Sequence, residues 1–218
     1  MIEDIAKLGI VAADSPEALG GKGMSRVDVG SLMYELAVKD GSIATFWLLH
    51  DSLSTYTVMC FAQDDLRKKI LADTIPLKKV MAWALTEPDT GSDASHIQTT
   101  ARKVEGGYLI NGHKKWIGNA TFADYILVWA KNQNDGGKVQ CFLVRKGSKD
   151  SLQARLKEKW HYEQFKMHTS SSSTSLSLTM RSSRRLMISG IQLKFCNILE
   201  SPLLGWLLAW LPGPAKPR

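Results

Sequence analysis

The chain has 218 residues, 44% hydrophobic and 22% charged, which is typical of a soluble globular protein long enough to bury a core. Its 28 Lys and Arg exceed its 21 Asp and Glu, giving a net charge of +7, but residues 160–218 contribute +5 of this (7 bases and 2 acids). A basic excess confined to one end does not indicate a nucleic-acid surface, and we expect no nucleic-acid partner.

The three cysteines, Cys60, Cys141 and Cys196, are odd in number, far apart and outside any CxxC pattern. This usage favours a reducing compartment and argues against a disulfide scaffold or a zinc site, so we expect no bound metal. The first residues show no basic segment followed by an apolar run, and no targeting signal is visible.

Residues 1–80 predict a helical domain, and a helix is expected almost from the first residue. Residues 25–40 carry apolar side chains at helical spacing. Ser25 with Asp28 three positions later is typical of a helix N-terminus. A shorter helix is expected over residues 64–72.

A further helix is expected over residues 42–62, a stretch about as long and apolar as a membrane span. His50 and Asp51 interrupt it, and a charged Asp at the centre of a lone span would cost several kcal/mol. We therefore interpret this stretch as a buried core helix whose polar side chains are hydrogen-bonded, and we expect no membrane span.

Residues 81–159 have the composition of a β domain, so the predicted fold class is α+β with an antiparallel, barrel-like second domain. The dipeptide Asn111-Gly112 predicts a tight hairpin turn, and residues 134–137 predict a second turn. Four runs rich in β-branched and aromatic residues predict strands: residues 104–110, 113–117, 125–130 and 139–144.

Residues 83–93 predict a strand end that breaks into a polar loop. Pro88 fixes φ, and Gly91 permits a backbone approach that no side chain would allow. Ser92 and the amides around Gly91 are suited to binding an anion such as a phosphate. Taken alone, the same residues fit an ordinary β-turn better than an anion site.

The segments ALTEPDTGSD (84–93) and GGYLINGHKKWIGNATFADYILVWA (106–130) together resemble the β-domain signature of the acyl-CoA dehydrogenase and acyl-CoA oxidase superfamily. Their wording is most similar to the plant-type short-chain acyl-CoA oxidases, then to glutaryl-CoA dehydrogenases, and the similarity extends over residues 1–159. The resemblance implies FAD as cofactor, an acyl-CoA thioester as substrate, α,β-dehydrogenation as the reaction, and a peroxisomal or mitochondrial matrix location.

The resemblance also implies roles for particular residues. Trp83, Leu85 and Thr86 would line the flavin ring, with their backbone amides and the Thr86 hydroxyl bonding its polar edge. Ser92 would contact the FAD pyrophosphate and lie near the pantetheine of the acyl-CoA.

In the second segment, the resemblance implies that Trp116 packs against the flavin ring and shields one side from water. Gly118 would lie near the flavin where many dehydrogenases have a threonine, as in the oxidase branch. The resemblance gives Glu87 a structural loop role. We interpret Lys114 and Lys115 as a solvated strand end.

In the family, the carboxylate that removes the α-proton lies in a C-terminal helical domain, which also supplies much of the FAD site and the oligomer interface. This domain is not recognisable in residues 160–218, so we expect no catalytic base in this chain and no activity from it alone. The alternatives are a non-catalytic fragment or interaction module, and a membrane-surface protein whose basic, Trp-rich tail binds anionic lipid in a salt-sensitive way.

After Lys159 no helical or strand period persists, and a serine run occupies residues 170–173. With compatible codons, the adjacent reading frame spells MALRTVQNA and FFNVFVPDD, strings that resemble the family sequence at this point. We hypothesise that residues 160–218 form an irregular tail read in a shifted frame. Sequencing the transcript across residues 152–170 tests this, since an intact frame would remove the hypothesis.

Overall fold

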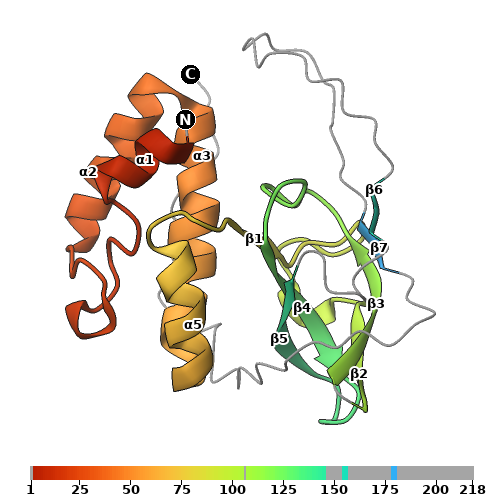
Figure 1. Cartoon of the computed structure of the whole chain (residues 1–218). Helices are drawn as coiled ribbons and strands as arrows, with labels where there is room; N and C mark the ends of the chain where they lie inside the picture. The colour runs from red at the N-terminus through yellow and green to blue at the C-terminus, as the bar shows by residue number, and fades with distance from the viewer. Residues whose placement is uncertain (1, 106, 146–153, 157–177, 181–218) are drawn as a thin grey trace, which may run out of the picture.

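The computed structural model describes residues 2–105, 107–145, 154–156 and 178–180. Helices come first and strands second (Figure 1), which confirms the α+β class. The helical elements are α1 (Ile2–Leu8), η1 (Glu17–Leu19), α2 (Arg26–Lys39), α3 (Gly41–Leu48), η2 (Leu49–Thr55), α4 (Tyr56–Phe61) and α5 (Asp64–Thr74). The strands, with the short helix η3 (Ala94–His96) after the first, are β1 (Met81–Ala84), β2 (Thr100–Val104), β3 (Gly107–Lys114), β4 (Tyr125–Asn132), β5 (Lys138–Arg145), β6 (Ala154–Leu156) and β7 (Leu178–Met180).

Helix α2 begins where the sequence predicts. The Ser25 hydroxyl accepts the Asp28 N–H at 3.2 Å, and the Asp28 carboxylate accepts the Ser25 N–H at 3.2 Å. This reciprocal pair satisfies two N–H groups that a helix start otherwise leaves unbonded. Val29 and Met33 are buried on the inner face of the helix, as the apolar spacing predicts.

The helix predicted over residues 42–62 is present as the consecutive segments α3, η2 and α4, of which η2 is a π-helix. Its wider turn is accompanied by side-chain bonds that reach back five residues. The Ser54 hydroxyl donates to the Leu49 carbonyl at 2.7 Å, and the Thr55 hydroxyl donates to the His50 carbonyl at 2.8 Å. The interpretation as a buried core helix is confirmed.

His50 and Asp51 are buried polar residues of this helix, and both are hydrogen-bonded. His50 Nδ1 accepts the Met81 N–H at 3.1 Å while its Nε2 lies 3.0 Å from the Thr74 carbonyl. The Asp51 carboxylate accepts the backbone N–H of Ala12. The imidazole therefore joins the end of α5 to the start of β1, and both residues are satisfied core polar groups, as predicted.

We expect His50 to add an acid-sensitive contribution to the free energy of unfolding. Burial lowers the pKa of His50 to about 4. The stability that the neutral imidazole contributes is therefore fully present above pH 6.5. It is lost as the pH falls from 6.5 towards 4, because over this range the unfolded chain binds the proton more readily than the folded chain does. Burial raises the pKa of Asp51 to about 7, which acts in the opposite direction over the same range and masks the loss.

The variant His50→Gln keeps one donor and one acceptor but cannot titrate. Urea unfolding at pH 7 and pH 4.5 should show His50→Gln gaining about 2–3 kcal/mol on the wild type as the pH falls. Equal pH dependence of the two proteins would show that the imidazole is not the titrating group.

The strands form a mixed sheet that curls into an open half-barrel (Figure 1). Strand β4 is central, pairing with β5 antiparallel and with both β1 and β2 parallel. The barrel-like sheet is confirmed, but its pairing differs from the antiparallel prediction. The reason is connectivity: β2 and β3 lie in the crossover between β1 and β4, and a long crossover allows parallel pairing.

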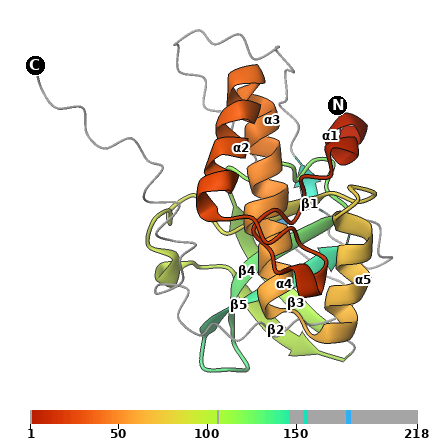
Figure 2. The same ribbon diagram turned by 90° about the vertical axis from the view of Figure 1, so that its left-hand side faces the viewer.

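The two faces of the sheet are buried in different cores. Along β1, Ala82 and Ala84 point into the half-barrel, whereas Met81 and Trp83 pack towards the helices. Figure 2 shows helices α3 and α5 standing in front of β4 and β5. The residues after β1 therefore emerge at the boundary between the helices and the sheet.

The predicted hairpin turn at Asn111-Gly112 is wrong. Both residues lie within β3, where Asn111 pairs with Thr100, and the chain reverses between Val104 and Gly107. Gly112 is needed for a close approach: a Cβ there would lie 2.3 Å from the Thr99 hydroxyl oxygen. The glycine signal was real, but it marked packing of one strand against a neighbour and not a turn.

The second predicted turn is confirmed between β4 and β5. The Gly137 N–H donates to the Asn132 carbonyl at 2.9 Å, and Gly136 and Gly137 have φ of 59° and 75°.

Of the predicted tail, 160–218, only β7 is among the described residues, so the reading-frame hypothesis stays a prediction. Cys196 also lies outside them.

Candidate functional site

The predicted flavin residues begin at the carboxyl end of β1. Trp83 pairs with Leu127 of β4, and its half-buried ring lies 4.9 Å from the Trp129 ring. Leu85 and Thr86 follow, both half-buried, where the chain leaves the sheet. Strand pairing thus fixes the first residue of this set, and the loop that follows carries the other two.

Thr86 has hydrogen-bonding capacity to spare. Its carbonyl accepts the Lys115 N–H at 2.9 Å, which ties the loop to the end of β3. No acceptor for the Thr86 N–H or hydroxyl lies within the described part of the chain. A half-buried residue with two unused donors suits a ligand that presents acceptor atoms.

Trp116 lies one residue beyond Lys115 and is 48% exposed, with φ of 61°. A left-handed conformation at a bulky side chain costs about 1–2 kcal/mol and has to be maintained by its surroundings. The Lys115 ammonium lies 5.0 Å from the ring centroid. Trp116 is therefore not a plain core aromatic, because it presents half of its surface outside the core.

Gly118 has a packing role in the structure. A Cβ at this position would lie 2.3 Å from Cδ1 of Leu49, the first residue of η2. The next residue, Asn119, donates through its amide to the Met81 carbonyl at 3.3 Å and to the Phe46 carbonyl at 3.4 Å. The loop after β3 is thereby held against both the helices and β1, and a larger residue at 118 would require Leu49 to move.

Lys114 was expected to be solvated, and this is wrong. Its side chain is fully buried, with Nζ 2.8 Å from the Leu85 carbonyl and 2.9 Å from a Glu87 carboxylate oxygen. Desolvation would raise the pKa of Glu87, but hydrogen bonds from Thr99, Gln98 and Lys114 hold it below its usual value. Glu87 thus has the structural role expected of it.

Ser92 lies further along the loop and is exposed. The loop is closed by reciprocal bonds between Glu87 and Thr90, at 2.9 and 3.4 Å, and the Ser92 carbonyl accepts the Ala94 N–H at 3.1 Å. No hydrogen bond in the described residues ties Ser92 to Thr86 or Trp116. Backbone and amide bonds therefore tie Thr86 to the residue before Trp116, and the residue after Gly118 to β1, whereas no such bond ties Ser92 to them.

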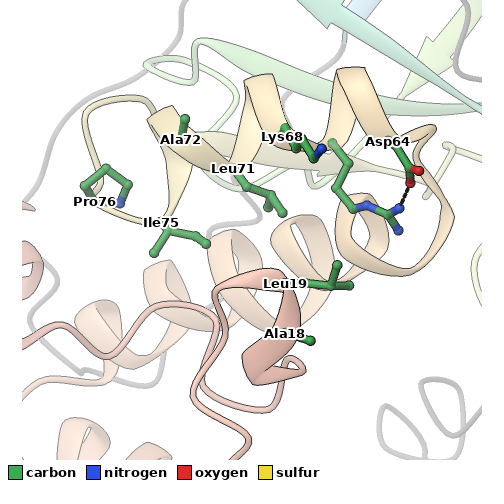
Figure 3. Close-up of a pocket in the computed structure, with 9 residues that line it drawn as sticks. Ala18, Leu19, Asp64, Lys68, Leu71, Ala72, Ile75 and Pro76 are labelled. Carbon is green, nitrogen blue, oxygen red and sulfur yellow. Dashed lines mark hydrogen bonds and ion pairs between the residues drawn. The ribbon is translucent and has the colours of Figure 1, made fainter.

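A cavity of about 540 Å³ lies elsewhere, between η1 and α5 (Figure 3). Leu71 of α5 and Ile75, the residue after that helix, face Leu19 across it, and an Arg67–Asp64 ion pair lies at one end. It shares no residue with the predicted flavin set. Cavity volume alone would therefore indicate a different place from the predicted flavin residues.

The described residues contain neither a membrane-spanning helix nor a cluster of metal ligands. None of the helices there is long and apolar enough to cross a bilayer. Nor does the same part of the chain contain a group of three or more His, Cys, Asp or Glu side chains arranged to hold a metal.

Comparison with known families matches two models to the chain. The acyl-CoA dehydrogenase N-terminal domain matches residues 1–76, and the acyl-CoA dehydrogenase middle domain matches residues 82–172. The first covers the helices and the second covers the sheet. The middle-domain match extends beyond residue 159, where the sequence pattern was expected to end.

Individual relatives, found by sequence and by structure, indicate the same family as the two models. A probable acyl-CoA dehydrogenase of Bacillus subtilis is 35% identical over 148 residues, which is 67% of this chain and 24% of the relative. The mitochondrial isovaleryl-CoA dehydrogenase of Arabidopsis thaliana is 31% identical over 135 residues, 61% of this chain and 33% of the relative. A glutaryl-CoA dehydrogenase of Mycobacterium smegmatis, solved in complex with FADH2, superposes with a TM-score of 0.63 at 26% identity, covering 68% of this chain and 38% of that one.

The chain thus spans about a quarter to two fifths of the length of these relatives. The matched segments contain the loop after β1 and the loop after β3, whose geometry is described above. The chain belongs to the acyl-CoA dehydrogenase family, of which it carries the N-terminal and middle domains.

Proposed function

We propose that residues 81–159 bind FAD and an acyl-CoA thioester, with the helices of residues 1–80 packed behind the site, and that the wider activity is FAD-dependent α,β-dehydrogenation of that thioester. The observation that carries the proposal is Thr86. It offers an N–H and a hydroxyl with no acceptor in the described part of the chain, and its carbonyl is tied to the residue next to an exposed tryptophan. FAD, when bound, supplies the acceptor for the hydride that leaves the acyl chain.

The residues of this chain would bind the flavin and cover one side of its ring system. Thr86 would donate its two hydrogen bonds to the polar edge of the ring system, and Trp116 would cover one side and exclude water. Ser92 and the amides near Gly91 would hold phosphate oxygens of FAD and lie near the pantetheine. Gly118 would lie near the flavin without offering a hydroxyl, and the direction of its absent side chain is filled by Leu49.

We expect the Thr86 hydroxyl to matter measurably for FAD affinity. One net hydrogen bond contributes about 1 kcal/mol, so Thr86→Val should raise the Kd for FAD about fivefold to tenfold in a titration that follows flavin fluorescence. Thr45→Val, which changes an exposed hydroxyl of α3, should leave the Kd unchanged. Saturable FAD binding that is indifferent to both changes would place the flavin elsewhere.

We also propose that this chain by itself does not turn over acyl-CoA. Removal of the α-proton needs a carboxylate that is free to accept it. Glu87 is buried next to the predicted site, but its oxygens already accept hydrogen bonds from Gln98, Thr99 and Lys114. Dye-linked and peroxide-producing assays with several acyl-CoA chain lengths should show no substrate-dependent rate, and a measurable rate would overturn this part.

A non-catalytic interaction module is a second candidate, favoured by the outer face of α2. Val27, Tyr34 and Val38 lie on one side of this helix and are 77%, 64% and 60% exposed. A folded chain that binds no FAD but self-associates or captures a partner through α2 would support this function instead. Val38→Glu would then abolish the association.

For cellular location we propose the mitochondrial matrix or the peroxisome, where acyl-CoA thioesters are oxidised. The mitochondrial isovaleryl-CoA dehydrogenase among the relatives supports the first. Family members are homo-oligomers, and we propose the same assembly for the full protein, with acyl-CoA and no nucleic acid as its ligand. Fractionation of cells expressing the protein tests the location.

A further inference from the structure

Lys114 is the last residue of β3 and points into the protein. Its ammonium donates to the Leu85 carbonyl at 2.8 Å and to Glu87 Oε1 at 2.9 Å. Burying an ammonium and a carboxylate is costly, and an apolar pair of similar size is often at least as stable. The pair therefore calls for an explanation other than stability.

Glu87 extends the connection to a third segment. Besides Lys114, its carboxylate accepts the N–H of Thr99 at 2.9 Å, the Thr99 hydroxyl, and the N–H of Gln98. The Glu87 carboxylate thus links the loop after β1, to which it belongs, with the chain entering β2 and with the end of β3. We call Leu85, Glu87, Thr99 and Lys114 the Glu87–Lys114 clamp.

The clamp holds the residues on both sides of Thr86. The residue before Thr86 is held through its carbonyl, the residue after it through its carboxylate, and the same ammonium binds both. The Thr86 carbonyl is held separately by the Lys115 N–H. All these bonds fix the backbone of Thr86 and none uses its N–H or its hydroxyl.

We propose that Glu87 and Lys114 are positioning residues, which hold Thr86 so that its N–H and hydroxyl stay available to the polar edge of a bound flavin. The inference deepens the proposed function and rests on it. Directional bonds fix a loop more narrowly than apolar contacts do, and fixing it before the ligand arrives reduces the entropy lost on binding. This is what the ion pair adds beyond what an apolar pair would give.

The test compares Lys114→Met with two controls in the full chain. Lys103→Met removes an exposed lysine of β2, and Ile70→Val loosens the buried face of α5 without touching the clamp. In a titration with FAD, Lys114→Met should raise the Kd at least tenfold and change the visible absorption band of the bound flavin. Both controls should stay within twofold of the wild type and keep the band unchanged.

Hydrogen–deuterium exchange tests whether the clamp holds the loop, and this test does not depend on flavin binding. In Lys114→Met, peptides that contain Lys115 and Thr99 should exchange faster than in the wild type, since their N–H groups bond to the clamped loop. If the wild type binds no FAD, the proposed function fails, while the exchange data still decide whether the clamp holds the loop. Unchanged exchange at these peptides would overturn the clamp.

A second variant covers the case in which Lys114→Met does not fold. Thr99→Val has nearly the same shape and removes one hydroxyl donor to Glu87. It should raise the Kd for FAD about threefold to fivefold, in the same direction as Lys114→Met. An affinity equal to that of the wild type in whichever of the two variants is folded would overturn the positioning role.

Discussion

Replacement of Gly112 by alanine is expected to lower the free energy of unfolding by at least about 3 kcal/mol. The added Cβ would lie 2.3 Å from the Thr99 hydroxyl oxygen and 2.6 Å from its Cα. Thr99 cannot retreat easily, because its N–H and hydroxyl bind Glu87 and its carbonyl accepts the Lys131 N–H at 2.8 Å. Urea unfolding followed by circular dichroism measures the effect.

Gly30→Ala is the matched control for this change. Gly30 lies inside α2, and apart from the helix's own backbone nearby nothing lies within 4 Å of an added Cβ. Alanine there should stabilise the protein by about 0.5–1 kcal/mol, because it restricts the unfolded chain and favours the helix. If both glycine variants changed stability by similar amounts, the close approach at Gly112 would not be the constraint that we describe.

Trp129→Ala is expected to have a comparable effect, lowering the free energy of unfolding by about 3–5 kcal/mol. Trp129 is fully buried on the helix-facing side of β4 and packs at 4.9 Å on Trp83. Its loss would leave a cavity between the sheet and α5, so the helices and the sheet would separate more easily. Differential scanning calorimetry should show a lower and broader transition.

Trp116→Ala is expected to affect FAD binding more than stability, in contrast to Trp129→Ala. Because Trp116 is 48% exposed, its truncation should change the free energy of unfolding by no more than about 1 kcal/mol. It should nevertheless weaken FAD binding at least tenfold if the ring covers the flavin. A large loss of stability in Trp116→Ala with unchanged FAD affinity would show that this tryptophan is a structural residue.

The helical half of the fold was predictable because its signals are local. The Ser25–Asp28 capping pair and the apolar spacing that follows it lie within a few residues of each other, and both are found as expected. The π-helix at Leu49–Thr55 was not predicted. Its bonds reach back five residues, and nothing in the apolar pattern distinguishes that register from the α-helical one.

The sheet was harder to predict because its constraints come from distant residues. Assigning a turn to Asn111-Gly112 split β3 in two and left Lys114 on an apparently solvated end. With β3 continuous, the alternation that buries Tyr108 and Ile110 also places Lys114 inward. The error at the glycine therefore caused the error at the lysine, and with it the clamp was missed.

The candidate site was located by resemblance and not by periodicity. Composition and turn chemistry allowed either an anion site or an ordinary turn after β1, whereas the family motifs singled out Thr86 and Trp116. The structure adds what neither source contained: the unused donors of Thr86, the positive φ of Trp116, and the contact of Gly118 with Leu49.

The most direct test of the central claim, that FAD binds where β1 ends, is a hydrogen–deuterium exchange footprint with and without FAD. The account predicts slower exchange on FAD addition in peptides spanning residues 83–87 and 114–119, and no change in α5. Protection confined to α5 and the cavity beside it, or no protection in a folded chain at saturating FAD, would contradict the account.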